Sequence, residues 1–94
     1  MADEVGHHMP QNAYLRTIGM SRADGPALGM TIADHALTRT FRGRGVAAMA
    51  KDIGLTAKER LLKDVLDIRK LFGSKYNEGL LEMIKYAKSI PGFI

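Results

Sequence analysis

The chain has 94 residues, no cysteine, a formal net charge of +4 and a hydrophobic fraction of 46%. A chain of this length is expected to form one domain with a real but marginal core. Without cysteine it has neither a disulfide framework nor thiolate ligands for a metal. Its apolar runs are far shorter than the roughly 18 residues that a membrane-spanning helix needs. Its polar, acidic start does not match a signal peptide. We therefore expect a cytoplasmic protein, or one within an intracellularly assembled particle.

Residues 1–30 show no sustained hydrophobic period and are interrupted by glycine and proline. Asp24-Gly25-Pro26 is a turn signal, and only residues 13–18 hold enough apolar side chains for a short helix or strand. Because a long segment without regular structure is unusual inside a compact domain, residues 1–30 are predicted to be an irregular, extended N-terminal arm. Residues 31–94 are then a helical domain. They also carry the basic excess, since the arm holds more acidic than basic side chains.

Two shorter helices are predicted next along the chain. Thr31 and Asp34 form a capping pattern that opens a helix running to about Phe41. A basic, glycine-rich joint at residues 42–45 breaks that helix. Residues 46–53 then form a short, alanine-rich helix, small enough to let neighbouring elements approach closely.

Residues 56–90 hold the strongest helical pattern. Thr56 and Glu59 have the spacing of a capping box, Gly73 stands where a left-handed C-terminal residue is wanted, and Pro91 ends the second helix. The short connection predicts an antiparallel αα-hairpin whose apolar faces close on each other. The predicted fold class is therefore all-α, with this C-terminal hairpin, the two shorter helices and the N-terminal arm. The apolar stripes are Leu61, Val65, Ile68 and Phe72 on one helix, and Tyr76, Leu80, Met83, Ile84, Ala87 and Ile90 on the other.

Basic side chains lie along the middle of the chain, where they suit an anionic partner such as nucleic acid. Guanidinium forks match phosphate oxygens, and the neighbouring glycines permit close approach of the backbone. A solvated surface is the alternative interpretation of the same charges. The candidate nucleic-acid-binding residues are Arg39, Arg42, Arg44, Lys51, Lys58 and Arg60.

The Ala50-Lys51-Asp52-Ile53-Gly54-Leu55-Thr56 run resembles the helix-turn-helix of λ-repressor-like regulators and addiction-module antitoxins. In those families a small alanine packs between the two helices, glycine makes the turn, and Thr or Ser caps the recognition helix. The resemblance implies that Ala57, Lys58 and Arg60 face DNA. The alternative is an ordinary capped corner between two helices.

No catalytic constellation is visible, and none of the serines has a nucleophile-elbow or triad context. His7, His8 and His35 are potential metal ligands by type, but a zinc site needs three or four converging ligands. We interpret these histidines as polar loop residues. The sequence therefore predicts no catalytic residue, no metal site and no cofactor, and it indicates no small-molecule substrate.

The first functional hypothesis is a non-enzymatic structural or assembly protein that docks through its N-terminal arm and basic helices. Its partner would be another protein or a further copy of itself, in a virion or multi-subunit particle. The alternative is a helix-turn-helix DNA-binding regulator using residues 46–72.

Overall fold

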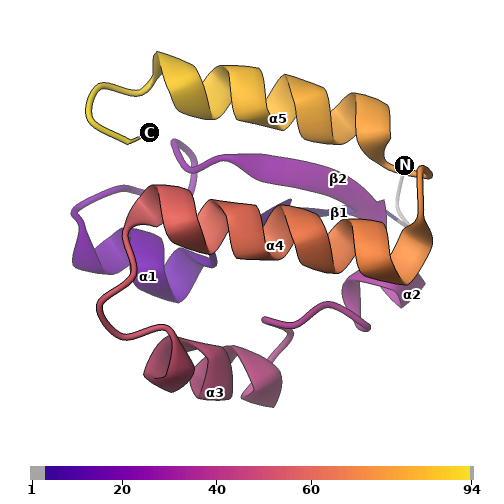
Figure 1. Cartoon of the computed structure of the whole chain (residues 1–94), viewed down its shortest axis with the longest axis horizontal. Coiled ribbons are helices and arrows are strands. Elements are labelled where there is room, and N and C mark those ends of the chain that lie inside the picture. Colours follow the sequence, from indigo (N-terminus) through magenta and orange to yellow (C-terminus); the bar gives the residue numbers. More distant parts are fainter. Residues whose placement is uncertain (1–3, 94) are drawn as a thin grey trace.

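The computed structural model describes residues 4–93 and contains a two-stranded antiparallel sheet surrounded by helices (Figure 1). The protein is mostly helical, but it is not purely α-helical. The elements in chain order are β1 (Glu4–His8), α1 (Asn12–Thr17), β2 (Ala27–Thr31), α2 (Ile32–His35), α3 (Gly43–Lys51), α4 (Ala57–Phe72) and α5 (Asn77–Ser89).

Residues 4–30 are folded into the domain as β1, α1 and most of β2. The predicted extended arm is therefore wrong over these residues, and the all-α class is correct only in that the protein is mostly helical. Residues 1–3 of the predicted arm lie outside the described residues. β1 pairs with β2 in a register that runs from Glu4 opposite Thr31 to His8 opposite Ala27. Alternate positions of a strand face the same side of a sheet, and this places Leu28 and Met30 in the core, fully buried. The radius of gyration is 12.3 Å, close to the roughly 12 Å expected for a compact chain of this length.

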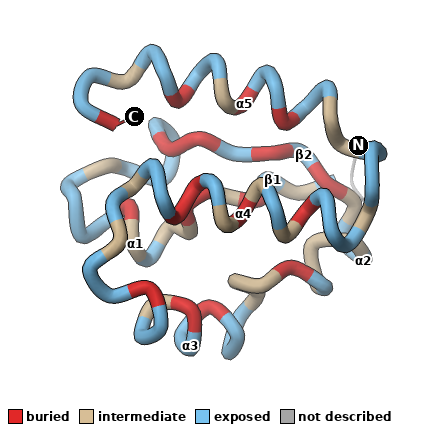
Figure 2. Tube along the Cα trace, in the orientation of Figure 1, coloured by how far each residue is buried: buried red, intermediate tan, exposed pale blue. Residues whose placement is uncertain are grey.

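α4 and α5 run antiparallel, as the hairpin prediction required, and β2 lies between them in the view of Figure 1. Buried residues of both helices belong to one core cluster with Leu28 and Met30 of β2, and Figure 2 shows buried positions along all three elements. α5 packs on β2 at Gly79, where a Cβ would lie 2.7 Å from Leu28 Cδ1. The core is therefore shared by both halves of the chain. It comprises Met9, Leu15, Leu28, Met30, Leu61, Ile68, Leu80, Met83, Ala87 and Phe93.

The predicted helix ends are confirmed in the C-terminal half. The Thr56 hydroxyl accepts from the Glu59 backbone N–H at 3.1 Å, and the Glu59 carboxylate accepts from the Thr56 backbone N–H at 2.9 Å. Gly73 has φ 61°, and Ile90 is extended just before Pro91. These signals are local and depend on neighbours within one turn, which is why the sequence alone revealed them.

The two shorter helices differ from their predicted bounds. Thr31 caps α2 as expected, but α2 ends at His35 instead of near Phe41. α3 begins at Gly43, so the predicted flexible joint is its first turn. Gly45 lets that turn approach the preceding loop, since a Cβ there would lie 2.5 Å from the Thr40 carbonyl oxygen.

Candidate functional site

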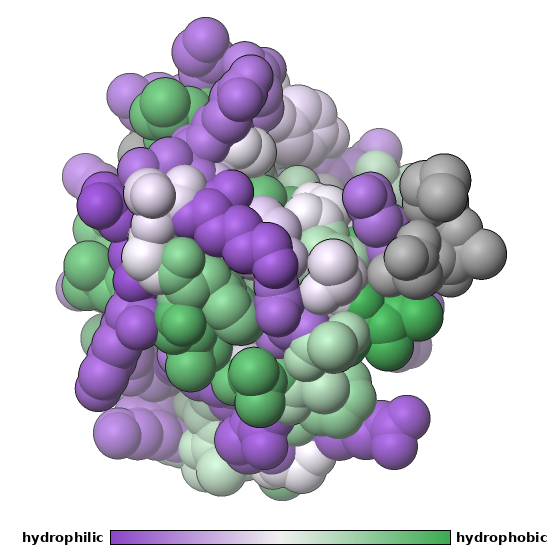
Figure 3. Space-filling model, turned by 90° about the vertical axis from the view of Figure 1, so that its right-hand side faces the viewer, coloured by the Kyte–Doolittle hydropathy of each residue, from purple (hydrophilic) through white to green (hydrophobic). Residues whose placement is uncertain are grey.

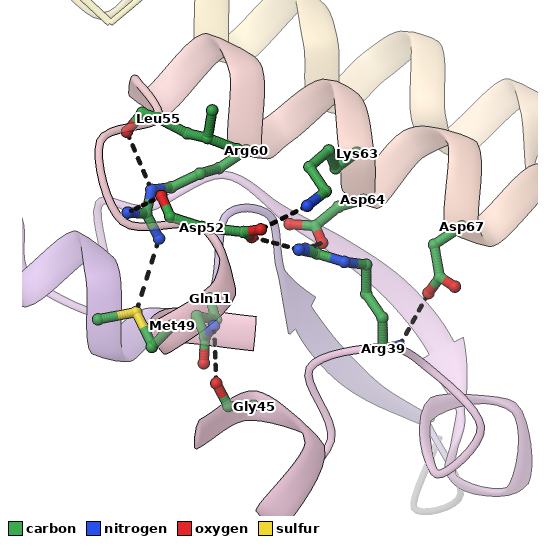
Figure 4. Close-up of polar contacts among 10 residues, drawn as sticks. All are labelled: Gln11, Arg39, Gly45, Met49, Asp52, Leu55, Arg60, Lys63, Asp64 and Asp67. Atoms are coloured by element: carbon green, nitrogen blue, oxygen red, sulfur yellow. Dashed lines mark hydrogen bonds and ion pairs between the residues drawn. The ribbon is translucent and has the colours of Figure 1, made fainter. Parts of the chain in front are cut away.

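The corner between α3 and α4 is held from inside by Arg60. Its guanidinium donates to the backbone carbonyl oxygens of Leu55 at 3.1 Å and Asp52 at 2.7 Å (Figure 4). The same group lies 4.0 Å from the centroid of the Tyr14 ring, in cation–π geometry. Arg60 is only 6% exposed. It is therefore a structural residue, enclosed by the turn that it stabilises.

Arg39 is the centre of a second buried network on the same side of α4 (Figure 4). Its guanidinium donates to Asp64 Oδ1 at 2.7 Å and also pairs with Asp52, which in turn pairs with Lys63. The Arg39 backbone N–H donates to Asp67 at 2.9 Å. These contacts tie the loop after α2 to both helices of the corner.

The two fully buried carboxylates of this network titrate differently. Burial works to raise the pKa of Asp52, but the bond and charge of Lys63, with the charge of Arg39, outweigh it and hold the pKa below its usual range. Burial raises the pKa of Asp64 to about 7, against the opposing charge of Arg39. Asp64 Oδ2 has no hydrogen-bond partner among the described residues. The space enclosed by Arg39, Asp52, Arg60 and Asp64 is too small for a water molecule, so we assign the network to stability.

The six candidate nucleic-acid residues are thus divided between the interior and the surface. Arg39 and Arg60 point into the protein. The Arg44 guanidinium donates to the backbone carbonyl of Thr38 at 3.0 Å and to that of Ala36. The Arg42 guanidinium lies 5.1 Å from the Phe41 ring centroid. Arg42, Arg44, Lys51 and Lys58 are exposed at the residue level, so four of the six remain accessible to a partner.

α3 turns an apolar face to solvent. Gly45 and Ala48 are buried on its inner side, whereas Val46 is 75% exposed and Ile53, just beyond the helix, is 79% exposed. Val46, Met49 and Ala50 follow the i, i+3, i+4 spacing of a helical face, and Ile53 follows just after the helix ends at Lys51. We call Val46, Met49, Ala50 and Ile53 the α3 stripe. Met49 is half-buried, with its sulfur 3.8 Å from the Arg60 guanidinium, whereas the other three are exposed. The resemblance placed Ala50 between the two helices, but Ala48 holds the buried position. The spacing of the stripe was readable from the sequence.

Other exposed apolar side chains occur near α2 and the end of α4. Figure 3 shows a band of hydrophobic side chains across the lower half of the face that carries the turn between α4 and α5. Ile32, Leu37 and Leu71 are 42–59% exposed. The two residues at the ends of the α3 stripe are more exposed than any of these.

The three histidines lie in two regular elements, His7 and His8 on β1 and His35 on α2, so the interpretation of them as loop residues is wrong. The rings of His7 and His35 meet edge to face, with centroids 5.2 Å apart, and His35 meets Phe41 in the same way at 5.3 Å. Burial lowers the pKa of His7 to about 3, helped by the nearby charges of His35, His8 and Arg39. Within residues 4–93, no three His, Cys, Asp or Glu side chains are placed to hold a metal ion.

A groove of about 650 Å³ runs between β2 and α5. Tyr76 and Tyr86 lie at its two ends. The Tyr76 hydroxyl donates to Asp34 at 2.6 Å, and the Tyr86 hydroxyl donates to the Asp24 backbone carbonyl at 2.7 Å. The remaining lining residues are Gly25, Ala27, Leu28, Gly29, Lys75, Gly79, Glu82 and Met83. This groove is not apparent from the sequence, because it depends on a strand within a segment whose pattern predicted an irregular arm.

Comparison with protein-family models gave no match, and comparisons with curated proteins and with solved structures gave none either. None of the helices in residues 4–93 combines the length and apolar character needed to cross a bilayer.

Proposed function

We propose that this protein is a non-enzymatic assembly component that docks onto a protein partner through the α3 stripe. The observation that carries the proposal is the exposure of Val46 on α3, at 75%, and of Ile53 just after that helix, at 79%. A regular apolar face on an outer helix is a common contact surface in protein assemblies. In this proposal α3 is the docking element, in place of the N-terminal arm that the sequence pattern suggested.

The charged residues beside the α3 stripe indicate the charge of the partner surface. Arg44 and Lys51 lie on α3 beside the apolar face and are exposed. Basic side chains around an apolar centre match a partner surface with acidic side chains around apolar ones. The +4 net charge of the chain favours the same class of partner.

The test compares two double variants of the full chain. Val46→Ser with Ile53→Ser removes the ends of the stripe. Leu66→Ser with Leu81→Ser removes two exposed leucines, 67% and 60% exposed, from α4 and α5. Both pairs should leave the fold intact, because exposed substitutions typically change stability by less than about 0.5 kcal/mol each. Native mass spectrometry of the protein purified from the cells that make it should show loss of the partner only for the first pair. Equal partner retention by both pairs would overturn the proposal.

DNA binding by α3 and α4 is a second candidate, favoured by the turn between them. Gly54 has φ 90°, and the capped first turn of α4 leaves Lys58 exposed, as a helix-turn-helix reader needs. Lys51→Ala with Lys58→Ala is the suitable variant, since Arg60 is structural. Sequence-specific duplex binding that falls steeply with salt and is lost in this variant would support the candidate. Equal, weak binding to every duplex would reject it.

A further inference from the structure

The outer edge of β2 has a definite hydrogen-bonding pattern. In an antiparallel pair, successive residues direct their N–H and C=O alternately toward the partner strand and away from it. The Met9 N–H donates to the Pro26 carbonyl at 3.0 Å, so Pro26 faces the β1 side. The Thr31 N–H instead lies 3.4 Å from the Tyr76 hydroxyl, on the α5 side. With the observed register, this alternation directs the backbone groups of Ala27 and Gly29 away from β1.

Ala27 and Gly29 both line the groove beside α5. Their backbone groups are therefore directed into an open channel. β2 pairs with β1 alone within residues 4–93. An edge strand with unpaired N–H and C=O groups is a template for a further strand.

α5 forms the wall of the groove opposite β2. The two tyrosines attach the helix near the two ends of β2. Between them Gly79 lines the groove, and a Cβ there would lie 2.7 Å from the Leu28 side chain of β2. The ten steps along the helix from Tyr76 to Tyr86 span about 15 Å at 1.5 Å per residue. An extended segment rises about 3.3 Å per residue, so roughly four residues fit between the tyrosines.

We propose that this groove binds an extended peptide segment of a partner protein, which pairs with Ala27 and Gly29 as a third strand of the sheet. Strand addition obtains affinity from main-chain hydrogen bonds and specificity from the side chains on either side. This site lies on β2 and α5, so it is separate from the α3 stripe and does not depend on the function proposed for it.

Charges in the groove indicate which segment fits. Lys75 is about half exposed and pairs with Asp34 at 2.7 Å, which leaves donors of its ammonium group for a ligand. Glu82 is largely exposed, with a long 3.8 Å contact to Lys85. The complementary segment carries an acidic side chain near Lys75 and a basic one near Glu82, with apolar or polar residues between them.

The probe is a set of linear ten-residue peptides selected from a random display library on the full-length protein. We expect selected peptides to slow hydrogen exchange of the Ala27 and Gly29 amides. N-methylation at alternate peptide positions should weaken binding at least about tenfold, while N-methylation at the intervening positions should not, because only alternate N–H groups face the sheet. Glu82→Lys should weaken the same peptides.

Gly29→Pro and Gly29→Ala form the matched pair of protein variants. Proline removes the N–H that faces the groove, whereas alanine keeps it, and a Cβ at Gly29 meets only Glu4 Oε1 at 3.9 Å. Binding should be lost in Gly29→Pro and retained in Gly29→Ala. Should the proline variant fail to fold, the N-methyl series decides the question alone. The proposal is overturned if no peptide is selected, if binding leaves the Ala27 and Gly29 amides unprotected, or if the edge instead pairs with a second copy, seen as a dimer by sedimentation.

Discussion

Arg60 donates a 2.7 Å hydrogen bond to the backbone carbonyl oxygen of Asp52, across the turn that joins α3 to α4. The helix-turn-helix resemblance implied that this arginine faces DNA. Its side chain instead closes over the turn and satisfies carbonyl groups at the end of α3. A basic residue at a position that resembles a DNA-contacting one can therefore stabilise the turn between the two helices instead.

Arg60→Ala should destabilise the protein by about 2–4 kcal/mol. It removes the donor to the Leu55 carbonyl, leaves the Asp52 carbonyl with the Leu55 N–H alone, and deletes a buried side chain packed on Tyr14. Lys58→Ala, two residues earlier and exposed, is the control and should change stability by less than about 0.5 kcal/mol. Urea denaturation of both variants measures the difference. Equal stability of the two would show that Arg60 does not hold the corner.

Arg39→Ala should also be costly, because it removes a cation that contacts two buried carboxylates, Asp52 and Asp64. Breaking a buried ion pair on one side costs about 3–5 kcal/mol. In an Asp64→Asn background the same change should cost less, since one of the stranded charges is gone. A double-mutant cycle by chemical denaturation measures this coupling. Additive costs would contradict the assigned pairing.

The helix ends were predictable from the sequence, because capping is a local interaction. Thr56, Glu59 and Gly73 act within one turn of the backbone, and each takes its predicted place. The predicted end of the helix near Phe41 was wrong, because contacts with residues distant in the sequence decide the path of the chain there. Arg39 turns inward to carboxylates on α3 and α4, and Arg44 bonds the carbonyls of Ala36 and Thr38. Those tertiary contacts fix the chain after His35 in a non-helical path.

β1 and β2 were not predicted, although the sequence of β2 has a weak alternating pattern. Leu28 and Met30 alternate with Ala27 and Gly29, which is the period of a strand with one buried face. Glycine and proline on either side made the segment look irregular. The pairing joins residues 19 to 27 positions apart, from His8 with Ala27 to Glu4 with Thr31, and periodicity within one segment does not reveal its partner. The groove beside β2 depended on that pairing, so it could not be predicted either.

Gly45→Ala and Gly43→Ala should change stability in opposite directions. A Cβ at Gly45 would lie 2.5 Å from the Thr40 carbonyl oxygen, within the backbone of the preceding loop, whereas a Cβ at Gly43 has open space. We expect Gly45→Ala to cost about 1–3 kcal/mol through overpacking. Gly43→Ala should stabilise by up to about 1 kcal/mol, because alanine loses less backbone entropy in a helix. Thermal unfolding followed by circular dichroism distinguishes them. A stabilised Gly45→Ala would refute the close approach.

His7 and Asp64 should impose opposite pH dependences on stability between about pH 5 and 6.5. The pKa of His7 is about 3 in the folded protein and near 6.5 when unfolded, so the unfolded chain binds the extra proton and stability rises with pH. The pKa of Asp64 is about 7 when folded and near 3.8 when unfolded. The folded protein then binds the extra proton, and stability falls as pH rises. Each slope is at most about 1.4 kcal/mol per pH unit.

The two variants His7→Gln and Asp64→Asn separate these slopes. His7→Gln should make stability fall more steeply with pH, because the Asp64 contribution remains. Asp64→Asn should make it rise, with His35 adding to the His7 effect, since burial also lowers the His35 pKa. Asp34, Asp52 and Glu59 have lowered pKa values, so their protonation lies below this window in both states. Denaturation midpoints at half-unit pH steps measure the slopes. Slopes that stay equal to the wild-type slope in both variants would show that neither buried group is linked to folding.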